Sequence, residues 1–396
     1  MPDFTEKRKL KILIVTGEPS GDTHAAKLVK KLRELAPETD FQFYGATGHR
    51  LAETGVETIV DSADFSIVGL PEIGKALPMF WKAFQKLKRE AIARKTDAVV
   101  LVDFPDFNLK LAKPLKKAGI KVFYYISPQL WAWRKYRKKT IANHVDLLLT
   151  ILPFEKDWYA RQGIGHVEYV GNPTVREIHS ELTKAEFCAK HKLDAEKPIV
   201  TLLPGSRHKE IVRILPVLLE TAATMTEKKT EIQFIVALAG NRKISELEEA
   251  RHLVKSDLSK VKLLTVQGET HEALNASDAA AVTSGTATLE TGIIGTPMAI
   301  VYKTSALNYK LLRPLISVEH FGLINLIAEE RLAKELIQDD FTPASLADEL
   351  FRLLEAEENR KFRARLHAVA EKLGHGGASR RAAEAILKKL TGTPPN

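Results

Sequence analysis

Carboxylates and an amide directly follow one apolar stretch of the chain. Asp103, Asp106 and Asn108 come after residues 97–102, which have the composition of a buried strand. A carboxylate at the end of such a strand can act as a general base when a substrate hydroxyl reaches it. Alternatively, Asp106 or Asn108 caps the helix that follows. We expect Asp103 to be the catalytic group and leave open whether Asp103 or Asp106 is the base.

The first strand-to-helix turn is rich in glycine and polar groups: Gly17, Glu18, Ser20, Gly21 and Asp22. Its glycines would let the backbone approach a ligand closely. It lacks the third glycine of the dinucleotide fingerprint and the lysine of a P-loop. The turn is therefore a candidate for contacts to a substrate, or else a tight turn in which Ser20 or Asp22 caps the helix.

Two turns in the second half suit phosphate groups. Gly205, Ser206 and Arg207 follow residues 199–203, and a guanidinium there presents a fork to phosphate oxygens. The second turn has small residues that expose backbone N–H groups at a helix N-terminus. It comprises Ser284, Gly285 and Thr286, with Glu290 one helical turn further on, where a carboxylate can accept hydrogen bonds from a ribose diol. The alternatives are a surface arginine and a plain helix cap.

Residues 127–139 interleave aromatic side chains with cations, among them Trp131 and Arg134. Such a stretch can bind single-stranded nucleic acid by stacking and phosphate contacts. It can equally hold a phosphorylated amphipathic molecule, or consist of packed indoles on a solvated basic helix.

Residues 65–89 combine an apolar stripe with cationic flanks, a pattern typical of a membrane-interface segment. The alternative is a core helix. The residues that we expect to meet a membrane are Val68, Leu70, Lys75, Leu77 and Lys82.

Composition narrows the class of protein. The 396 residues are 44% hydrophobic and 28% charged, which excludes a disordered or fibrous chain, and the net charge of +9 favours an anionic partner.

The single cysteine, Cys188, excludes an internal disulfide, and we expect it to be structural. Scattered histidines and the lack of an Asp-x-Asp pair predict that there is no metal and no cofactor. Apolar runs too short for a span or signal peptide predict a cytosolic protein that can lie on a membrane surface.

The elements that must position these turns alternate between strands and helices, which is the pattern of parallel sheets covered on both faces. A polar helical stretch at 176–195 is expected to join two doubly wound α/β domains. We expect strands at 10–16, 41–44, 97–102, 120–126, 145–151, 167–170, 199–203, 232–238, 261–266, 279–283 and 298–302, and helices at 22–35, 107–118, 154–162 and throughout 343–390.

Together, the turns resemble those of the lipid-A-disaccharide synthase family of inverting glycosyltransferases. The matching strings are GEPSGD at 17–22, DFPDFN at 103–108, SPQLWAWR at 127–134, LPFE at 152–155, LPGSR at 203–207 and SGTATLE at 284–290, with Asn325-Leu326 and Glu335-Leu336 further on. One departure is Asn172, where the family usually has histidine, so no histidine role is carried over.

The resemblance implies an α/β fold of the GT-B type: two facing Rossmann-like domains with the active site in the cleft between them. The expected domains are 1–175 on the acceptor and membrane side, 176–375 on the UDP-sugar donor side, and a C-terminal helix and tail at 376–396. Asp103 and Arg207 are expected to be essential, and Asn325 to line the site. Lipid A biosynthesis is the implied pathway.

The implied substrates are UDP-2,3-diacylglucosamine and 2,3-diacylglucosamine 1-phosphate, which give a β-1,6-linked disaccharide 1-phosphate and UDP. The resemblance places the protein on the cytoplasmic face of the inner membrane, an anionic surface, with no nucleic-acid partner and a homodimer left open. Two other readings remain: another UDP-sugar enzyme of this fold, such as an epimerase, and a nucleic-acid-binding protein suggested by net charge and the 127–139 stretch.

Overall fold

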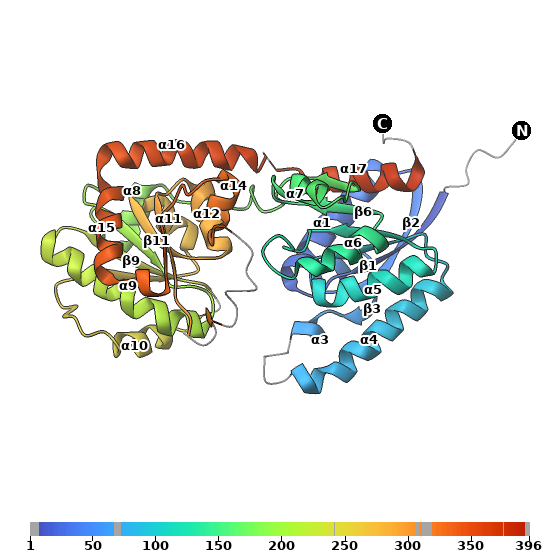
Figure 1. Ribbon diagram of the computed structural model, residues 1–396, viewed down its shortest axis with the longest axis horizontal. Helices are drawn as coiled ribbons and strands as arrows, with labels where there is room; N and C mark the ends of the chain where they lie inside the picture. Colours follow the sequence, from blue (N-terminus) through green and yellow to red (C-terminus); the bar gives the residue numbers. More distant parts are fainter. Residues whose placement is uncertain are drawn as a thin grey trace, which may run out of the picture. The chain divides into compact units, whose positions relative to one another are not determined.

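The computed structural model describes residues 8–66, 73–240, 242–305, 309–310, 319–374 and 376–392 (Figure 1). The chain divides into two compact units, Met1–Pro173 with Gly376–Asn396 and Thr174–His375. Each unit is built on its own parallel sheet. The segment predicted to form a separate C-terminal helix and tail, 376–396, belongs to the first unit through its described residues, 376–392.

The first unit contains a seven-stranded parallel sheet of order β3-β2-β1-β4-β5-β6-β7. Its elements are β1 (Arg8–Val15), α1 (Pro19–Leu35), β2 (Thr39–Thr47), α2 (His49–Ala52), β3 (Glu57–Asp61), α3 (Ala63–Ser66), α4 (Ile73–Ala93), β4 (Ala98–Val102), α5 (Pro105–Lys117), β5 (Lys121–Tyr125), η2 (Lys135–Arg137), α6 (Lys138–His144), β6 (Leu147–Thr150), α7 (Glu155–Arg161), β7 (Val167–Tyr169) and, from the end of the chain, α17 (Ala378–Thr391).

Alternate residues of the central strands contribute to two hydrophobic cores, one on each face of this sheet. Ile12 and Ile14 pack with α1 and α17, while Leu13 and Val15 pack with α4 and α5. The last helix, drawn in red, accordingly lies among the blue and green elements of the first unit (Figure 1). Arg381 of α17 also donates to the carbonyl of Val170 at 2.8 Å. The C-terminal helix is therefore a structural part of the first unit.

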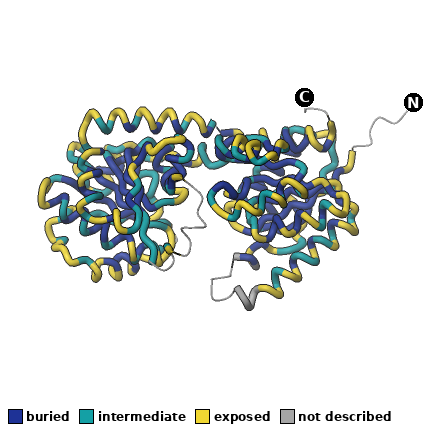
Figure 2. The backbone as a smooth tube through the Cα atoms, viewed as in Figure 1, coloured by how far each residue is buried: buried dark blue, intermediate teal, exposed yellow. Residues whose placement is uncertain are grey.

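The second unit contains a six-stranded parallel sheet of order β10-β9-β8-β11-β12-β13. Its elements are α8 (Lys184–His191), β8 (Ile199–Leu203), α9 (His208–Lys228), β9 (Gln233–Leu238), α10 (Ser245–Arg251), β10 (Lys262–Gln267), α11 (Thr270–Ala276), β11 (Ala279–Thr283), α12 (Thr286–Ile294), β12 (Met298–Tyr302), α14 (Leu323–Ala328), β13 (Glu335–Ile337), η4 (Gln338–Asp340), α15 (Pro343–Leu354) and α16 (Ala356–Lys372). In each unit the dark blue, buried residues gather in the strands and on the inner faces of the helices (Figure 2).

The predicted junction helix at 176–195 is mostly wrong, since only Lys184–His191 is helical. Thr183 and Glu186 form a reciprocal capping box that starts the helix, and Lys192 ends it with a left-handed backbone. Cys188 is buried in this helix, as expected of a structural cysteine.

Strand order reverses once in each sheet, between β1 and β4 in the first and between β8 and β11 in the second. Both pairs are parallel, so the turns that follow each pair leave the same edge of the sheet side by side. In open α/β sheets, ligands bind at the carboxyl ends of strands where the order reverses. The fold therefore singles out the turns after β1, β4, β8 and β11.

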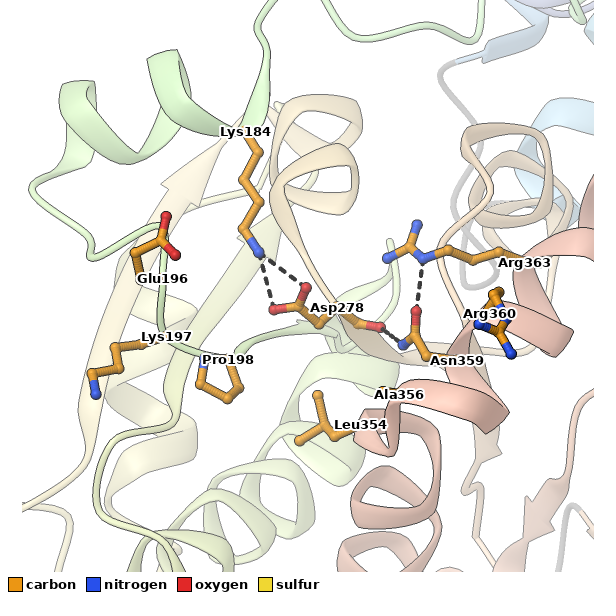
Figure 3. Close-up of a pocket in the computed structure, with 10 residues that line it drawn as sticks. All are labelled: Lys184, Glu196, Lys197, Pro198, Asp278, Leu354, Ala356, Asn359, Arg360 and Arg363. Atoms are coloured by element: carbon orange, nitrogen blue, oxygen red, sulfur yellow. Dashed lines mark hydrogen bonds and ion pairs between the residues drawn. The ribbon is translucent and has the colours of Figure 1, made fainter.

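A pocket of about 460 Å³ lies at the opposite, amino end of the second sheet (Figure 3). There the Asp278 carboxylate accepts from Lys184 Nζ at 3.0 and 3.2 Å and from the Ile199 N–H at 2.9 Å. Arg363 of α16 donates to the carbonyls of Ser277 and Gly295, both at 2.9 Å. These polar contacts join α8 and α16 to the sheet, so the pocket's charged side chains are largely engaged in holding the unit together.

Candidate active site

Asp103 occupies an unusual turn directly after β4. Asp103 and Phe104 both have left-handed backbones, with φ values of +47° and +48°. The Asp103 N–H donates to the carbonyl of Tyr125 at 2.9 Å. Its own carbonyl accepts from Asn108 Nδ2 at 2.8 Å and from the Tyr124 hydroxyl at 2.6 Å. The turn is thus fixed by hydrogen bonds that leave the carboxylate free of these structural contacts.

Burial, reinforced by the charge of Glu18, raises the pKa of the Asp103 carboxyl to about 6. The N–H of Phe104 opposes this shift only in part. A carboxylate with a pKa near 6 is ionised at neutral pH and more basic than an ordinary aspartate. Asp103 can therefore accept a proton from a bound hydroxyl.

Asp106, the alternative base, has different surroundings. Its carboxylate pairs with Arg134 at 2.7 Å and with Arg137. Although burial alone would raise the pKa of Asp106, the two guanidinium groups lower it below its usual value. Such a carboxylate holds a proton weakly, so Asp103 is the better base of the two.

The turn after β1 faces the Asp103 turn. Gly17 has no room for a side chain, because a Cβ there would lie 2.3 Å from the ring of Phe104. Glu18 and Ser20 are exposed at the same sheet edge. The alternative in which Ser20 or Asp22 caps α1 is not seen, since α1 already begins at Pro19 with Glu18 as its N-cap residue and no side chain bonded there.

Asp22, one helical turn into α1, is engaged within the protein. Its buried carboxylate accepts N–H bonds from Gly48 at 2.6 Å, Arg50 at 2.9 Å and Leu51 at 3.2 Å. Asp22 therefore caps the short helix α2. The neighbouring Gly21 is buried beneath the Val102 carbonyl.

Trp131 lies in the core rather than on a surface where it could stack on a ligand. Its indole donates to Glu155 Oε1 at 3.1 Å, while Glu155 Oε2 accepts the N–H groups of Ile151 and Leu152. Burial raises the pKa of Glu155 to about 7. The exposed aromatic side chains of this stretch are instead Trp133 and Tyr136.

The turn after β8 presents a cation to solvent. Gly205 has a φ of +108°, and a Cβ there would lie 2.6 Å from Glu210 Oε2. Glu210 accepts the N–H groups of Ser206 and Arg207 at 3.2 and 3.3 Å. The Arg207 side chain remains 82% exposed, although its guanidinium approaches Glu210 to 3.3 Å. Arg207 is thus available to an anionic ligand.

The turn after β11 presents backbone N–H groups at the start of α12, and β11 pairs with β8, the strand that precedes Arg207. Gly285 is the N-cap residue of α12, with no side chain bonded there, and Thr286 opens the helix in an exposed position. Ser284 Oγ donates to the Phe321 carbonyl at 2.7 Å. Further along, Glu290 lies 3.1 Å from His271 Nε2, and this hydrogen bond raises the pKa of His271.

Asn325, expected in the site, is instead a buried structural residue. Its amide donates to the Ala333 carbonyl at 2.8 Å and to Glu335 at 2.9 Å, and its Oδ1 accepts the Ala333 N–H. Asn108 is likewise fully buried beneath the Asp103 turn. Neither amide offers a surface to a substrate.

A family model described as lipid-A-disaccharide synthetase matches residues 12–390. The chain belongs to the lipid-A-disaccharide synthase family. It is 42% identical to the lipid-A-disaccharide synthase of Trichlorobacter lovleyi over 97% of this chain and 98% of that protein. It is 40% identical to the enzyme of Geobacter metallireducens over 96% and 97%.

Solved structures show the same fold at low identity. A putative UDP-N-acetylglucosamine 2-epimerase from Listeria monocytogenes has a TM-score of 0.65 at 14% identity and covers 98% of both chains. MurG from Acinetobacter baumannii has a TM-score of 0.55 at 15% identity, over 96% of this chain and 99% of MurG. The expectation of two Rossmann-like domains of the GT-B class is confirmed.

Membership of the lipid-A-disaccharide synthase family makes the protein a glycosyltransferase of lipid A biosynthesis. The epimerase alternative rests on fold likeness alone and is not favoured. None of the helices in the described part of the chain has both the length and the hydropathy of a transmembrane span.

The segment expected at the membrane is only partly described. Val68 and Leu70 lie outside the described residues, as does the side chain of Lys75. In the rest of α4, Leu77 is 61% exposed and Lys82 is exposed. Other α4 residues pack against the first sheet, including Ala83, Phe84 and Leu87. The protein therefore has a helix that contributes to the core and also presents apolar surface.

Three residues that the structure places beside the predicted turns were not predicted from the sequence. Tyr124 bonds Asp103, His271 bonds Glu290, and Arg242 donates to the Ser206 carbonyl at 3.4 Å. Tyr124 stands in an apolar strand and has no sequence signal for this role. Arg242 does have a sequence signal, because it is a cation that follows a strand end, that of β9, which lies next to β8 in the sheet.

Proposed function

We propose that this glycosyltransferase joins UDP-2,3-diacylglucosamine to 2,3-diacylglucosamine 1-phosphate, with Asp103 as general base. The observation that carries the proposal is the Asp103 carboxylate, whose pKa is raised to about 6 at the carboxyl end of β4. Family membership supplies the reaction class, and the raised pKa suits proton removal from a sugar hydroxyl at neutral pH.

In the proposed step, the acceptor's 6-hydroxyl oxygen attacks the anomeric carbon of the donor while its proton passes to Asp103. The bond between that carbon and the UDP oxygen breaks, and UDP leaves with the electron pair. A single displacement inverts the anomeric centre, so an α-linked donor gives a β-1,6-linked disaccharide 1-phosphate.

The leaving diphosphate needs positive charge where its own charge develops. Arg207 can supply a forked guanidinium, and Gly285 and Thr286 open α12 with N–H groups and the positive end of a helix dipole. We place Gly205, Ser206 and Ser284 in the same donor site. Glu290, held by His271, is assigned to the ribose hydroxyls.

For the acceptor, the exposed groups near Asp103 are Glu18 and Ser20, whereas Gly17 is buried against the Phe104 ring. Arg134, paired with Asp106, is a candidate for the acceptor's phosphate. Exposed Leu77 and Lys82 of α4 suit an anionic lipid surface, which supports a cytoplasmic protein peripheral to the inner membrane.

The deciding experiment incubates the purified protein with both lipid substrates in detergent and follows disaccharide 1-phosphate and UDP together. Equimolar formation of the two products is expected, and Asp103→Asn should abolish it. Release of UDP without the disaccharide, or conversion of the UDP-sugar to an epimer, would refute the proposed transfer. The Asp106→Asn variant is the matched control, since it removes a neighbouring carboxylate from the same turn.

A further inference from the structure

We propose that Tyr124 is a positioning residue of the transfer reaction, holding the Asp103 peptide in the turn from which its carboxylate works. This inference rests on the proposed role of Asp103 as base. Its basis is one contact: the Tyr124 hydroxyl donates to the Asp103 carbonyl at 2.6 Å.

The turn needs to be held, because two successive residues with side chains adopt the left-handed region. Asp103 and Phe104 pay a steric cost there that glycine would avoid. Such conformations persist only where the surrounding structure over-determines them, and they gather at active sites. Here the supports are the Tyr125 carbonyl, the Asn108 amide and the Tyr124 hydroxyl.

The Phe104 ring closes the turn from another side. It lies over Gly17, where a Cβ would come within 2.3 Å, and stacks on Phe65 and Phe107 with centroids 5.4 and 5.6 Å away. Ring packing therefore fixes Phe104, while hydrogen bonds fix the Asp103 peptide. Loss of one hydrogen bond should let that peptide rotate without dismantling the aromatic cluster.

In the Tyr124 side chain, the ring packs in the core and the hydroxyl positions the Asp103 turn. Its ring belongs to the core and is completely buried, so phenylalanine would fill nearly the same space. Burial, with the charge of Asp103 second, raises the pKa of the Tyr124 hydroxyl, which stays a neutral donor throughout the working pH range. The hydroxyl therefore adds a hydrogen bond to the turn and no charge.

Relaxation of the turn should expose the Asp103 carboxylate to water. Its raised pKa depends first on burial, so exposure would lower it toward 3.8. The other titratable groups acting on Asp103 or Tyr124 are Glu18, Tyr159, Arg137 and Asp106. None of them is removed by changing Tyr124 to phenylalanine, so a shift in the pH profile would report on the turn itself.

The test compares Tyr124→Phe with Tyr44→Phe. Tyr44 is another buried tyrosine of the same sheet, and its hydroxyl bonds that of Thr96 near the amino end of β4, the opposite end from Asp103. For Tyr124→Phe we expect kcat to fall about 5- to 50-fold, KM for both substrates to change less than twofold, and the acid limb of the kcat profile to move at least 0.5 pH units lower. Tyr44→Phe should lose a similar amount of Tm and keep kcat and its profile.

An unchanged kcat and acid limb in Tyr124→Phe would overturn the inference and leave the hydroxyl a purely structural role. Adding Tyr124→Phe to Asp103→Asn should lower the residual rate no further, because Tyr124 acts only through Asp103. A further drop would also overturn it. If Asp103→Asn itself keeps full activity, the proposed base fails instead, and the two failures are distinguished.

Should Tyr124→Phe not fold, Gly17→Ala displaces the same turn through the Phe104 ring. A lower kcat with a lowered acid limb in that variant would support a turn on which catalysis depends. An unchanged profile would overturn the inference.

Discussion

At the scale of single residues, the pKa of Asp103 links catalysis to stability. We expect Asp103→Asn to lower kcat by about 10²- to 10⁴-fold, the usual cost of losing a general base. The same change should raise the free energy of unfolding by ~1–2 kcal/mol at pH 8, since a half-buried charge is replaced by a neutral amide. Steady-state assays and urea titrations measure the two effects, and a near-normal kcat would transfer the base role to Asp106.

The raised pKa of Asp103 sets the direction in which activity and stability change with pH. Folding raises the pKa of Asp103 from 3.8 to about 6, so in that interval the folded protein binds a proton that the unfolded chain releases. Activity should therefore fall as the pH drops through about 6. The stability advantage of Asp103→Asn should grow as the pH rises from about 4 to about 6 and then level off. Denaturant titrations at pH 4, 6 and 8 test this, and an advantage that shrinks with rising pH would contradict it.

Arg207 and Glu290 should affect the donor in different ways. Arg207→Ala should lower kcat by about 10²-fold or more, because in the proposed donor site the guanidinium meets charge that develops only as UDP leaves. Glu290→Ala should instead weaken UDP binding by about tenfold with a smaller loss of kcat, because the ribose is unchanged during the reaction. Calorimetry with UDP separates the two, and unaltered UDP affinity in Glu290→Ala would remove its ribose assignment.

At the scale of elements, the sequence predicts the central strands well but misses two of the four edge strands of the two described sheets. Strands 199–203, 279–283 and 298–302 match the structure, because burial on both faces makes each a nearly continuous apolar run. The edge strands Glu57–Asp61 and Glu335–Ile337 went unpredicted, since each is only partly buried and begins with an acidic residue. A short mixed strand gives too little pattern to be distinguished from a loop.

The chemistry-bearing turns could also be predicted, because glycines and polar groups directly follow buried strands. What each side chain contacts could not be predicted. Asp22 caps a helix 27 residues further on, and Trp131 bonds a glutamate 24 residues away. From the sequence alone, Tyr124 cannot be distinguished from the other apolar residues of its strand. Contacts of this kind depend on tertiary packing, which single-sequence patterns do not encode.

Asp22 tests this distinction between a structural and a substrate role. Asp22→Ala leaves three N–H groups at the start of α2 without their carboxylate, so we expect the free energy of unfolding to fall by about 2 kcal/mol. Thr23→Ala, the next residue on α1, should change it by less than about 0.5 kcal/mol. Thermal unfolding measures both. Full stability together with lost activity in Asp22→Ala would return Asp22 to the substrate site.

The turns after β8 and β11 make a further prediction about metal dependence. A guanidinium and a helix N-terminus can hold the diphosphate of UDP, so turnover should survive excess EDTA. Product formation is measured before and after exhaustive chelation, with EDTA-inhibited alkaline phosphatase as the control for chelation. Loss of activity that Mg²⁺ or Mn²⁺ restores would contradict the expectation.

At the scale of the whole molecule, the net charge of +9 and the exposed residues of α4 both favour binding to an anionic membrane surface. Leu77 and Trp81 are four residues apart on one helix face and are 61% and 63% exposed. Exposed lysine at position 82 adds a cation beside them, and such charges attract anionic lipid at about 1 kcal/mol each at low salt. This face of α4 can therefore bind an anionic bilayer by apolar contact and charge together.

The double variant Leu77→Ser, Trp81→Ser should reduce co-sedimentation with anionic vesicles about tenfold and raise KM for both lipid substrates. UDP affinity and Tm should stay unchanged, because neither side chain is buried in the core. Ile92→Ser is the matched control: it removes an exposed apolar residue from the other end of α4 and should keep vesicle binding. Raising salt from 50 to 500 mM should weaken wild-type binding by screening the lysines. If the double variant loses Tm while its sedimentation per folded molecule is unchanged, α4 serves only the core, and membrane contact must come from another part of the chain.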